Sequence, residues 1–289
     1  MEQTSTGRVR FFIIQPAVRT PRARAKAARC SCSTRRADRF ARVLRTIWVV
    51  FVAIFVTILF SLTTIALVTV RARESLVARA IRTWARLIVW SAGIDLHAEN
   101  LELIDPAKRY ILIANHYSYF DIPCIFAAIP QPIRFMAKVS LFKIPIFGWA
   151  LARSGFIPID RKNRRTAVKS FDLAGERIRR GNTIVIFPEE GRSRERAMRP
   201  FQRGAFLLAL KSELPIVPMA IKGTFDVMPA GRFRIKSGPV KITLTPPIET
   251  AGVSVRDKEK LSQESRSRIE KLLFGEATAG SPPMQPETE

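Results

Sequence analysis

The sequence predicts an α/β fold, in which a mostly parallel sheet is covered by helices and preceded by a membrane-embedded N-terminal helix or helical hairpin. Residues 47–70 form an uninterrupted apolar run without a charged residue. From residue 93 to about residue 275, short apolar runs rich in β-branched residues alternate with segments of helical period, which favours parallel strands joined by helices. We therefore divide the chain into four parts: residues 1–46, 47–92, 93–275 and 276–289.

The composition bounds the classes of protein to which the chain can belong. It has 289 residues, with 48 Lys and Arg against 24 Asp and Glu, a formal charge of +24 and a pI of about 11.2. Its 47% of apolar residues is enough for a core, which excludes a wholly disordered chain. The positive charge predicts anionic partners: nucleic acid, a membrane surface or phosphorylated metabolites. Three cysteines and two histidines leave little for a disulfide framework or a metal site, and we predict neither a metal nor a cofactor.

Residues 1–46 are predicted to form a flexible basic arm. Up to Arg45 the chain holds twelve Lys and Arg against two acidic residues, and it shows no sustained apolar period. Such a segment fits a solvated tail or one that contacts lipid headgroups. Its Arg-rich, acid-poor composition also resembles an organelle transit peptide.

The segment Ile47–Val70 is predicted to be embedded in a membrane. Its 24 residues carry no charge, and as a helix they extend about 36 Å, enough for a hydrocarbon core of about 30 Å. A buried helix of a water-soluble core rarely has so long an uncharged run. A cleaved signal peptide has a shorter apolar region nearer to the first residue.

The charges that flank this segment do not decide its orientation. The 20 residues before it contain six Arg and the 20 after it contain five, which is almost a tie under the positive-inside rule. A tie fits a re-entrant hairpin with both ends cytosolic at least as well as a simple span. In the stretch Leu76–Trp90, apolar residues such as Trp84 and Ile88 share one helical face, and Arg79 and Arg82 lie on another. We therefore predict an amphipathic helix that lies in the membrane interface.

The third part of the chain is predicted to contain six strands and three main helices. The expected strands are Tyr110–Ala114, Ile133–Ala137, Phe156–Ile159, Thr183–Phe187, Ile216–Ile221 and Val240–Leu244. The expected helices are Arg165–Arg180 (stopped by Gly181), Gln202–Ser212 (ending before Pro215) and Asp257–Leu273. Residues 276–289, rich in Gly, Pro and Glu, are predicted to be a disordered tail.

A histidine and an aspartate follow the first expected strand of this part. Ligands bind beyond the carboxyl ends of strands in open α/β sheets, which is where His116 lies. A histidine takes a proton from a hydroxyl best when a carboxylate holds its other ring nitrogen, and Asp121, five residues on, can fold back to do this. On spacing alone, a turn histidine and a helix-capping aspartate remain the alternative. His97 has no such partner in the sequence pattern and is predicted to be structural.

Two further strand ends carry arginines. The strand that ends at Ile159 is followed by Asp160 and Arg161, and the strand that ends at Phe187 is followed by a loop that contains Gly191 and Arg192. Two guanidinium groups at neighbouring strand ends can clamp a phosphate, and a glycine lets the backbone approach an anion closely. Taken alone, each of these two segments could equally be a solvated basic loop without a binding role.

Four sequence blocks together resemble the glycerolipid acyltransferase family. The blocks are Asn115–Asp121 with four residues between His and Asp, Gly155–Arg161, Phe187–Ser193 and Leu214–Met219, in the family's order. The linking stretch Met136–Trp149 is also typical, and the resemblance covers about residues 75–250. One block departs from the family pattern: the usual Glu-Gly-Thr-Arg is Glu189-Glu190-Gly191-Arg192 here.

The resemblance implies a 1-acyl-sn-glycerol-3-phosphate O-acyltransferase type of enzyme and a role for each matched residue. His116, oriented by Asp121, is the expected base that deprotonates a lysophospholipid hydroxyl and then protonates the departing thiolate. Glu189 is expected to orient an arginine or to hydrogen-bond the glycerol, and backbone N–H groups near Gly191 to stabilise the oxyanion. The residues expected to bind substrate are Asn115, Lys138, Arg161, Glu189, Gly191 and Arg192.

The expected partners are membrane lipids, a lysophospholipid acceptor, and acyl-CoA or acyl carrier protein as the donor. The expected location is a membrane, with the catalytic domain on the cytoplasmic side of a cell inner membrane. A different acceptor, lyso-ornithine lipid or another lysophospholipid, would use the same pair of residues. Nucleic-acid binding rests on charge alone and leaves the 24-residue apolar segment unexplained, and a silent membrane adaptor would not need the His/Asp pair and both arginines.

Overall fold

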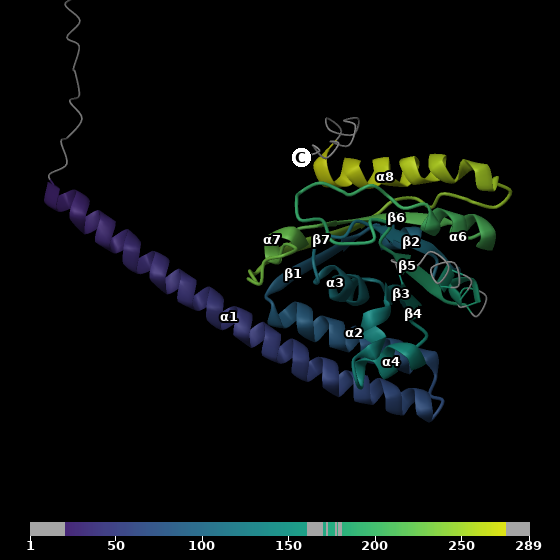
Figure 1. Ribbon diagram of the computed structural model, residues 1–289, viewed down its shortest axis with the longest axis horizontal. Helices are drawn as coiled ribbons and strands as arrows, with labels where there is room; N and C mark the ends of the chain where they lie inside the picture. Colours follow the sequence, from purple (N-terminus) through teal and green to yellow (C-terminus); the bar gives the residue numbers. More distant parts are fainter. Residues whose placement is uncertain (1–20, 161–169, 172, 177, 179–180, 276–289) are drawn as a thin grey trace, which may run out of the picture. The chain divides into compact units, whose positions relative to one another are not determined.

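Seven strands form one sheet in the order β1-β7-β6-β2-β5-β3-β4 in the computed structural model (Figure 1). The strands are β1 (Ile94–Glu99), β2 (Ile111–Ala114), β3 (Ile133–Lys138), β4 (Ile157–Ile159), β5 (Thr183–Ile186), β6 (Ile216–Lys222) and β7 (Gly238–Leu244). The structure describes residues 21–160, 170–171, 173–176, 178 and 181–275. Contacts divide the chain into two units, residues 1–41 and 42–289, and the sheet belongs to the second.

The sheet is mostly parallel, as predicted. β2 pairs in parallel with β5 and β6, and β3 pairs in parallel with β5 and β4. β7 runs antiparallel to β6, and β1 runs parallel to β7. The central strands β2 and β5 are buried at every position, which is why their sequences are continuous apolar runs rather than alternating ones.

The six predicted strands are found within two residues of their expected ends, and β1 is an additional strand. Its side chains alternate in burial, with Asp95, His97 and Glu99 exposed, because it is an edge strand. The charged residues at every second position hide the strand from a search for apolar runs. His97 lies on this exposed side, with Nε2 3.0 Å from Asp95 Oδ2.

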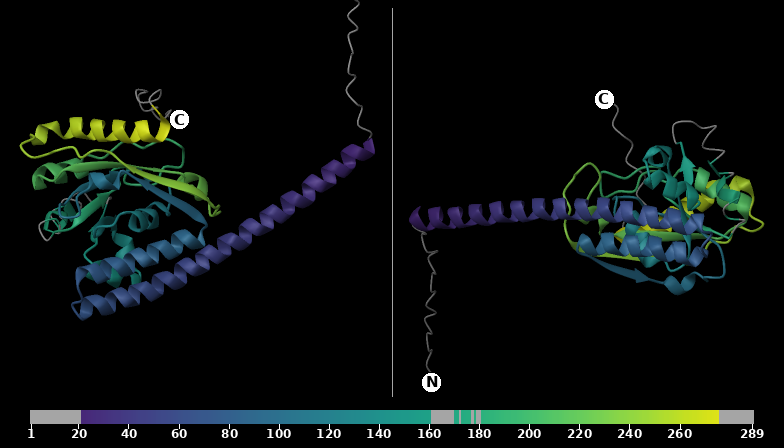
Figure 2. Two further views of the ribbon diagram at one scale, coloured as in Figure 1. Left: turned by 180° about the vertical axis from the view of Figure 1, so that it is seen from behind. Right: turned by 90° about the horizontal axis from the view of Figure 1, so that it is seen from below.

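Helices cover both faces of the sheet (Figures 1 and 2). One face carries α2 (Glu74–Ser91), α3 (Asp121–Ala128) and α4 (Phe147–Arg153), and the other carries α6 (Gly204–Ser212) and α8 (Lys258–Phe274). The short elements are η1 (Leu101–Leu103), η2 (Val139–Lys143), α7 (Thr224–Val227) and η3 (Val255–Asp257). Two apolar clusters result, one on each face: Leu112, Phe135 and Val185 belong to the first, and Ile111, Ile184 and Phe206 to the second.

The helix before the sheet domain, α1 (Pro21–Thr69), contains the predicted apolar segment. In the part of the chain that the structure describes, one segment, Phe40–Thr69, is long and apolar enough to cross a membrane, judged by length and composition. Within the second unit, Val49 of this helix is buried in the first cluster. Thr57 Oγ1 accepts a hydrogen bond from Trp84 Nε1 of α2 at 3.0 Å. The part of α1 that belongs to the second unit, Arg42–Thr69, therefore packs against the sheet domain along one side.

The amphipathic helix predicted after this segment is α2, and its apolar residues divide between two environments. Ile88 is buried against the sheet, and Trp84 packs partly buried beside it. Leu76, Leu87 and Trp90 are exposed. Part of the helix thus belongs to the core of the domain, and the remaining apolar side chains stay available to a membrane surface.

Some expected segments fall on residues that are not described. The flexible arm expected at residues 1–46 is not found over its second half, because residues 21–46 are part of helix α1. Residues 1–20, the tail expected at 276–289 and the start of the helix expected at Arg165–Arg180 lie outside the described residues. Residues 170–171 and 173–176 of that helix are helical. The helices expected from Gln202 and from Asp257 are α6 and α8.

Packing around α4 generates a testable prediction about stability. A Cβ added at Gly148 would collide with the backbone carbonyl of Phe142, and overpacking of this kind costs about 1–3 kcal/mol. We expect Gly148→Ala to lower the thermal unfolding midpoint of the detergent-solubilised protein. The matched control is Gly238→Ala, because an added Cβ there meets nothing within 4 Å. Equal midpoints for the two variants would contradict this packing.

Candidate active site at the carboxyl ends of the strands

The predicted site residues follow the carboxyl ends of neighbouring strands. β2 ends at Ala114 and is followed by Asn115 and His116, while β5 is followed by the loop that contains Glu189. Lys138 is the last residue of β3, next in the sheet. Because these strands are parallel, their ends meet at the same edge of the sheet, which is where open α/β sheets bind ligands.

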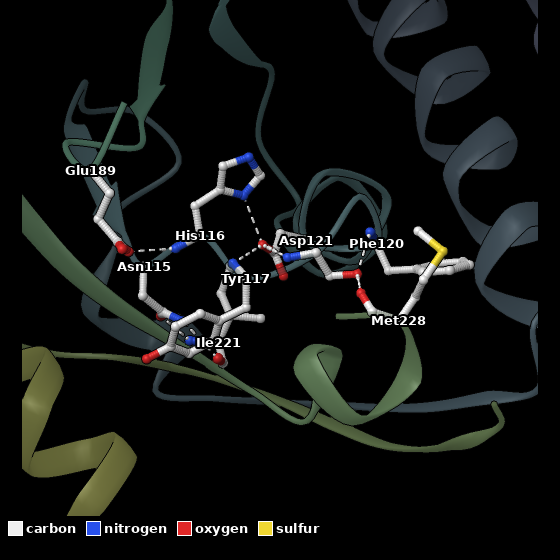
Figure 3. Close-up of polar contacts among 9 residues, drawn as sticks. Asn115, His116, Tyr117, Phe120, Asp121, Glu189, Ile221 and Met228 are labelled. Atoms are coloured by element: carbon white, nitrogen blue, oxygen red, sulfur yellow. Dashed lines mark hydrogen bonds and ion pairs between the residues drawn. The ribbon is translucent and has the colours of Figure 1, made fainter. Parts of the chain in front are cut away.

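His116 and Asp121 form the pair that their spacing predicts (Figure 3). Nδ1 of His116 lies 2.8 Å from Oδ2 of Asp121, whose side chain is fully buried. The same oxygen accepts the backbone N–H groups of Tyr117 and Ser118, each at 2.8 Å. The carboxylate at the start of α3 thus folds back over the loop that carries the histidine, and it selects the tautomer with a proton on Nδ1. Nε2 is then left as a base.

The ring of His116 is also fixed from the side. It stacks on Phe187 with a centroid distance of 4.0 Å and an interplanar angle of 15°. Phe187 in turn stacks on Phe135, centroid to centroid 5.7 Å. The histidine side chain keeps 12% of its surface exposed, so a substrate can approach one edge of a ring that is held by a hydrogen bond and by stacking.

Glu189 holds the backbone of the histidine. Its side chain is buried, and Oε1 accepts the N–H of His116 at 2.8 Å while Oε2 accepts the N–H of Arg199 at 2.8 Å. Burial raises the pKa of this carboxyl to about 7, although the two backbone hydrogen bonds oppose the rise. The sequence led us to expect Glu189 to face an arginine side chain or the glycerol, whereas the structure places both of its oxygens on backbone amides.

Asn115 is a second residue that holds the strand end. Its Nδ2 donates to the carbonyl of Ile221 at 2.9 Å, and its Oδ1 accepts the N–H of Ile221 at 2.8 Å. The side chain is fully buried, so it extends the pairing of β2 with β6 beyond the last strand residue. The geometry gives Asn115 a positioning role, and the substrate contact expected for it stays a prediction.

Of the three predicted phosphate-binding residues, the structure describes Arg192 and Lys138. The guanidinium of Arg192 lies over the ring of Tyr119, 3.5 Å from its centroid, and Tyr119 is in the loop between His116 and Asp121. Lys138 is exposed at the end of β3. Arg161 lies outside the described residues. The structure therefore brings one predicted arginine beside the His/Asp loop and places one lysine along the same edge.

The third sequence block has an unusual backbone. Glu190, which stands where the family pattern has glycine, adopts a positive φ of 53°, a conformation that costs a non-glycine residue energy. A Cβ at Gly191, where the family has threonine, would lie 2.6 Å from a guanidinium nitrogen of Arg199. The two residues have thus exchanged small and large side chains, and the space beside Gly191 is occupied by Arg199. Ser193 N–H, in the same loop, donates to the carbonyl of His116 at 2.9 Å.

The Ser118 hydroxyl and the Cys124 thiol, which lie near the His/Asp pair, are not arranged as nucleophiles. The hydroxyl of Ser118 is buried and donates to the carbonyl of Met228 at 2.7 Å. Burial and the nearby Asp121 carboxylate raise the pKa of the Cys124 thiol, which keeps it protonated. These environments favour direct attack by a substrate hydroxyl over an acyl-enzyme.

An apolar cavity of about 100 Å³ lies on the face of the sheet that α2 and α4 cover. Phe135, the second ring of the stack that begins at His116, forms part of its wall, and so does Ile122, the residue after Asp121. The rest of the wall comes from α1, α2, η2 and α4, including Phe60, Thr64, Trp84, Leu141, Ala150 and Leu151. The cavity therefore shares one wall residue, Phe135, with the aromatic stack that supports the histidine.

Sequence reasoning missed three contributors to this site. The sequence predicts Phe187 as the last residue of a strand. In the structure it directly follows β5, and its ring stacks on that of His116. Tyr119 and Met228 had no motif of their own, and Met228 follows α7 more than 100 residues beyond the loop that it holds. For Tyr119, the signal was an aromatic residue inside the His–Asp loop.

Residues 95–222 match the family model described as Acyltransferase. A chloroplastic 1-acyl-sn-glycerol-3-phosphate acyltransferase of Brassica napus is 32% identical over 172 residues, which are 59% of this chain and 48% of that protein. An enzyme of the same name from Chlamydomonas reinhardtii is 30% identical over 185 residues, 64% of this chain and 54% of that protein. This chain thus spans about half the length of the curated relatives it matches.

A solved structure shows the same fold. The crystal structure of the 1-acyl-sn-glycerophosphate (LPA) acyltransferase PlsC from Thermotoga maritima superimposes with a TM-score of 0.72 and 24% identity, and the match covers 81% of this chain and 95% of that one. All four sequence blocks lie inside residues 95–222, the range that the family model matches. The resemblance that they predicted is confirmed: residues 95–222 match the acyltransferase family model.

Proposed function

We propose that the protein is an O-acyltransferase that moves a fatty acyl group from an acyl thioester to the free hydroxyl of 1-acylglycerol-3-phosphate. The product is phosphatidic acid for phospholipid biosynthesis. The observation that carries this proposal is the bond between His116 Nδ1 and the buried carboxylate of Asp121 at the edge of the sheet. The matched relatives, which are named for this activity, support the same reaction.

The proposed reaction uses His116 twice. Nε2 accepts the proton of the acceptor hydroxyl while the hydroxyl oxygen attacks the carbonyl carbon of the thioester. The tetrahedral intermediate then collapses, the carbon–sulfur bond breaks, and Nε2–H returns the proton to the thiolate. General base catalysis of this kind contributes about 10²–10⁴-fold to the rate. Asp121 contributes by holding the tautomer and stabilising the imidazolium between the two steps.

The acceptor phosphate requires cations near the histidine. Arg192 is within the third sequence block and lies against the His–Asp loop through Tyr119. Stacking on the ring limits the rotamers of Arg192, which lowers the entropy that is lost when its fork binds a phosphate. We assign Arg192, Arg161 and Lys138 to the acceptor phosphate, and the backbone N–H groups near Gly191 to the oxyanion. None of these roles requires a metal or a further cofactor.

Membrane attachment is part of the proposal. The apolar segment of α1 (Phe40–Thr69) and the exposed apolar residues of α2 and α4, such as Leu87, Trp90 and Trp149, supply a surface that water does not favour. Both substrates are amphiphiles, so a site beside this surface can receive them from a bilayer. We propose a location in the cell inner membrane with the catalytic domain on the cytoplasmic side, where anionic lipids attract a basic protein.

The acceptor is tested with purified protein, one acyl-CoA and a panel of acceptors, by following the release of thiol. We expect the highest kcat/KM for 1-acylglycerol-3-phosphate, because two or more cations face its phosphate. The exchange of Glu190 and Gly191 favours one alternative, an acceptor with a different headgroup such as lyso-ornithine lipid. A clear preference for such an acceptor would overturn the assignment of substrate and leave the reaction class intact.

The catalytic pair is tested with His116→Ala and Asp121→Asn. His116→Ala should abolish acyl transfer and leave the protein folded and membrane-bound, because the ring lies at the edge of the sheet. Asp121→Asn should reduce kcat by about 10²–10⁴-fold, since the amide presents a donor to the donor Nδ1–H and to two backbone N–H groups. Circular dichroism and membrane fractionation check the folding of both variants. Turnover by His116→Ala at the wild-type rate would refute the assigned base.

The apolar cavity is proposed to hold the donor's acyl chain, and two substitutions with opposite effects test this. Ala150→Leu narrows the cavity and should shift the preference of the enzyme to shorter chains, whereas Leu151→Ala widens it and should shift the preference to longer ones. Each buried methylene is worth about 0.8 kcal/mol, or roughly fourfold in kcat/KM. Competition between acyl-CoA donors of different lengths measures the shift. An unchanged chain-length profile in both variants would exclude the cavity as the acyl site.

A further inference from the structure

A second and larger cavity lies on the other face of the sheet. It has a volume of about 930 Å³ and is bounded by the edge strand β1, by its neighbour β7, by α7 and by the C-terminal end of α8. Leu273 and Phe274, the last residues of α8, form one wall, and Lys222 at the end of β6 forms another. We call it the lysine cleft. None of the roles assigned above uses it.

The lysine cleft carries more positive than negative charge. Two of its cations are paired: Arg196 with Asp226, and Lys241 Nζ with Glu99 Oε1 at 2.7 Å. The remaining two, Lys222 and Lys236, make no ion pair with any residue that the structure describes. Two unpaired ammonium groups in one concave site attract an anion, and the low-dielectric walls focus their field.

The cleft begins one residue from the catalytic histidine. Tyr117 forms part of its wall, and Arg196 belongs to the loop in which Ser193 N–H holds the carbonyl of His116. The Tyr117 side chain is only 4% exposed, and its hydroxyl has no hydrogen-bond partner among the described residues. A buried hydroxyl without a partner is costly in a finished fold.

The apolar cavity proposed to hold the acyl chain and the lysine cleft lie on opposite faces of the sheet. The ring of His116 stacks on Phe187 of the first apolar cluster, whereas Tyr117 belongs to the second. A thioester at His116 therefore sits between an apolar cavity and a cationic cleft. A donor that fits both has a fatty chain on one side of its thioester and a multiply charged anion on the other.

We propose that the lysine cleft binds the nucleotide phosphates of acyl-CoA, with Lys222 and Lys236 as the residues that contact them. This inference rests on the proposed function and names the donor that the sequence left open. The volume of the cleft falls in the range of sites for ligands of this size, about 300–1,000 Å³. A concave site that contains two unpaired cations fits a small polyanion better than the convex surface of an acidic carrier protein.

The experiment compares Lys222→Ala/Lys236→Ala with the wild type and with Lys211→Ala/Lys260→Ala. The control removes the same charge from two exposed lysines of α6 and α8. Binding of coenzyme A itself, without acyl chain or acceptor, is measured by calorimetry in a neutral detergent. The KM values for acyl-CoA, for an acyl-pantetheine thioester that lacks the nucleotide, and for the acceptor are measured separately.

We expect the cleft variant to bind coenzyme A about tenfold more weakly or worse, because charge-assisted contacts to phosphate are among the stronger polar contacts. Its KM for acyl-CoA should rise by a similar factor, with the KM for acyl-pantetheine and for the acceptor unchanged. The control should bind coenzyme A as the wild type does. Equal weakening in the control would show a general charge effect and overturn the assignment.

Two further results would also overturn the inference: wild-type binding of coenzyme A by the cleft variant, or turnover with acyl carrier protein as donor but not with acyl-CoA. Failure of the proposed function gives a different pattern. If no acceptor is acylated and yet coenzyme A binding depends on Lys222 and Lys236, the cleft assignment stands and the reaction is wrong.

Discussion

One carboxylate oxygen organises the site. Oδ2 of Asp121 accepts hydrogen bonds from the imidazole of His116 and from two successive backbone N–H groups of the loop between them. The oxygen is fully buried, so water cannot replace any of these donors, and removal of the carboxylate would leave them unpaired. The position of the loop, the tautomer of the ring and the start of α3 therefore all depend on the same few contacts, which explains why four residues must separate His and Asp.

The second buried carboxylate shows what this arrangement costs. Glu189 holds the N–H of His116 with one oxygen and the N–H of Arg199 with the other, and burial raises the pKa of its carboxyl to about 7. An unfolded glutamate has a pKa of about 4.3, so the folded state binds the extra proton between these values. The contribution of Glu189 to stability is therefore largest below about pH 4 and falls as the pH rises to about 7. Above pH 7 both oxygens are acceptors, which is the form that matches two N–H donors. The hydrogen bonds of Glu189 in the site are therefore best matched above pH 7, the range in which Glu189 contributes least to the stability of the fold.

The sequence predicts those parts of the structure that depend on neighbours in the chain. The central strands are buried on both faces, so their apolar runs reveal them, and the His116–Asp121 pair is contained in one loop. β1 escapes the same search because Asp95, His97 and Glu99 face solvent on every second residue. The roles of Glu189 and Asn115 escape it for another reason. Each meets a backbone group of a distant segment, such as Ile221, which lies 106 residues beyond Asn115, and no local pattern carries that information.

Strand geometry also explains how one site can serve a substrate with two unlike ends. Successive side chains of a strand point to opposite faces of a sheet, and β2 continues this alternation past its last residue. His116 therefore points to the face with the aromatic stack and the apolar cavity, and Tyr117 points to the face with the lysine cleft. In the binding mode proposed above, the thioester lies at the edge between the faces, where the acceptor hydroxyl reaches it. A fatty chain requires an apolar site, whereas a polyanion requires a polar site with cations. In the proposed binding mode the two sites lie on opposite faces of the sheet, so each end of the donor meets the environment that it requires.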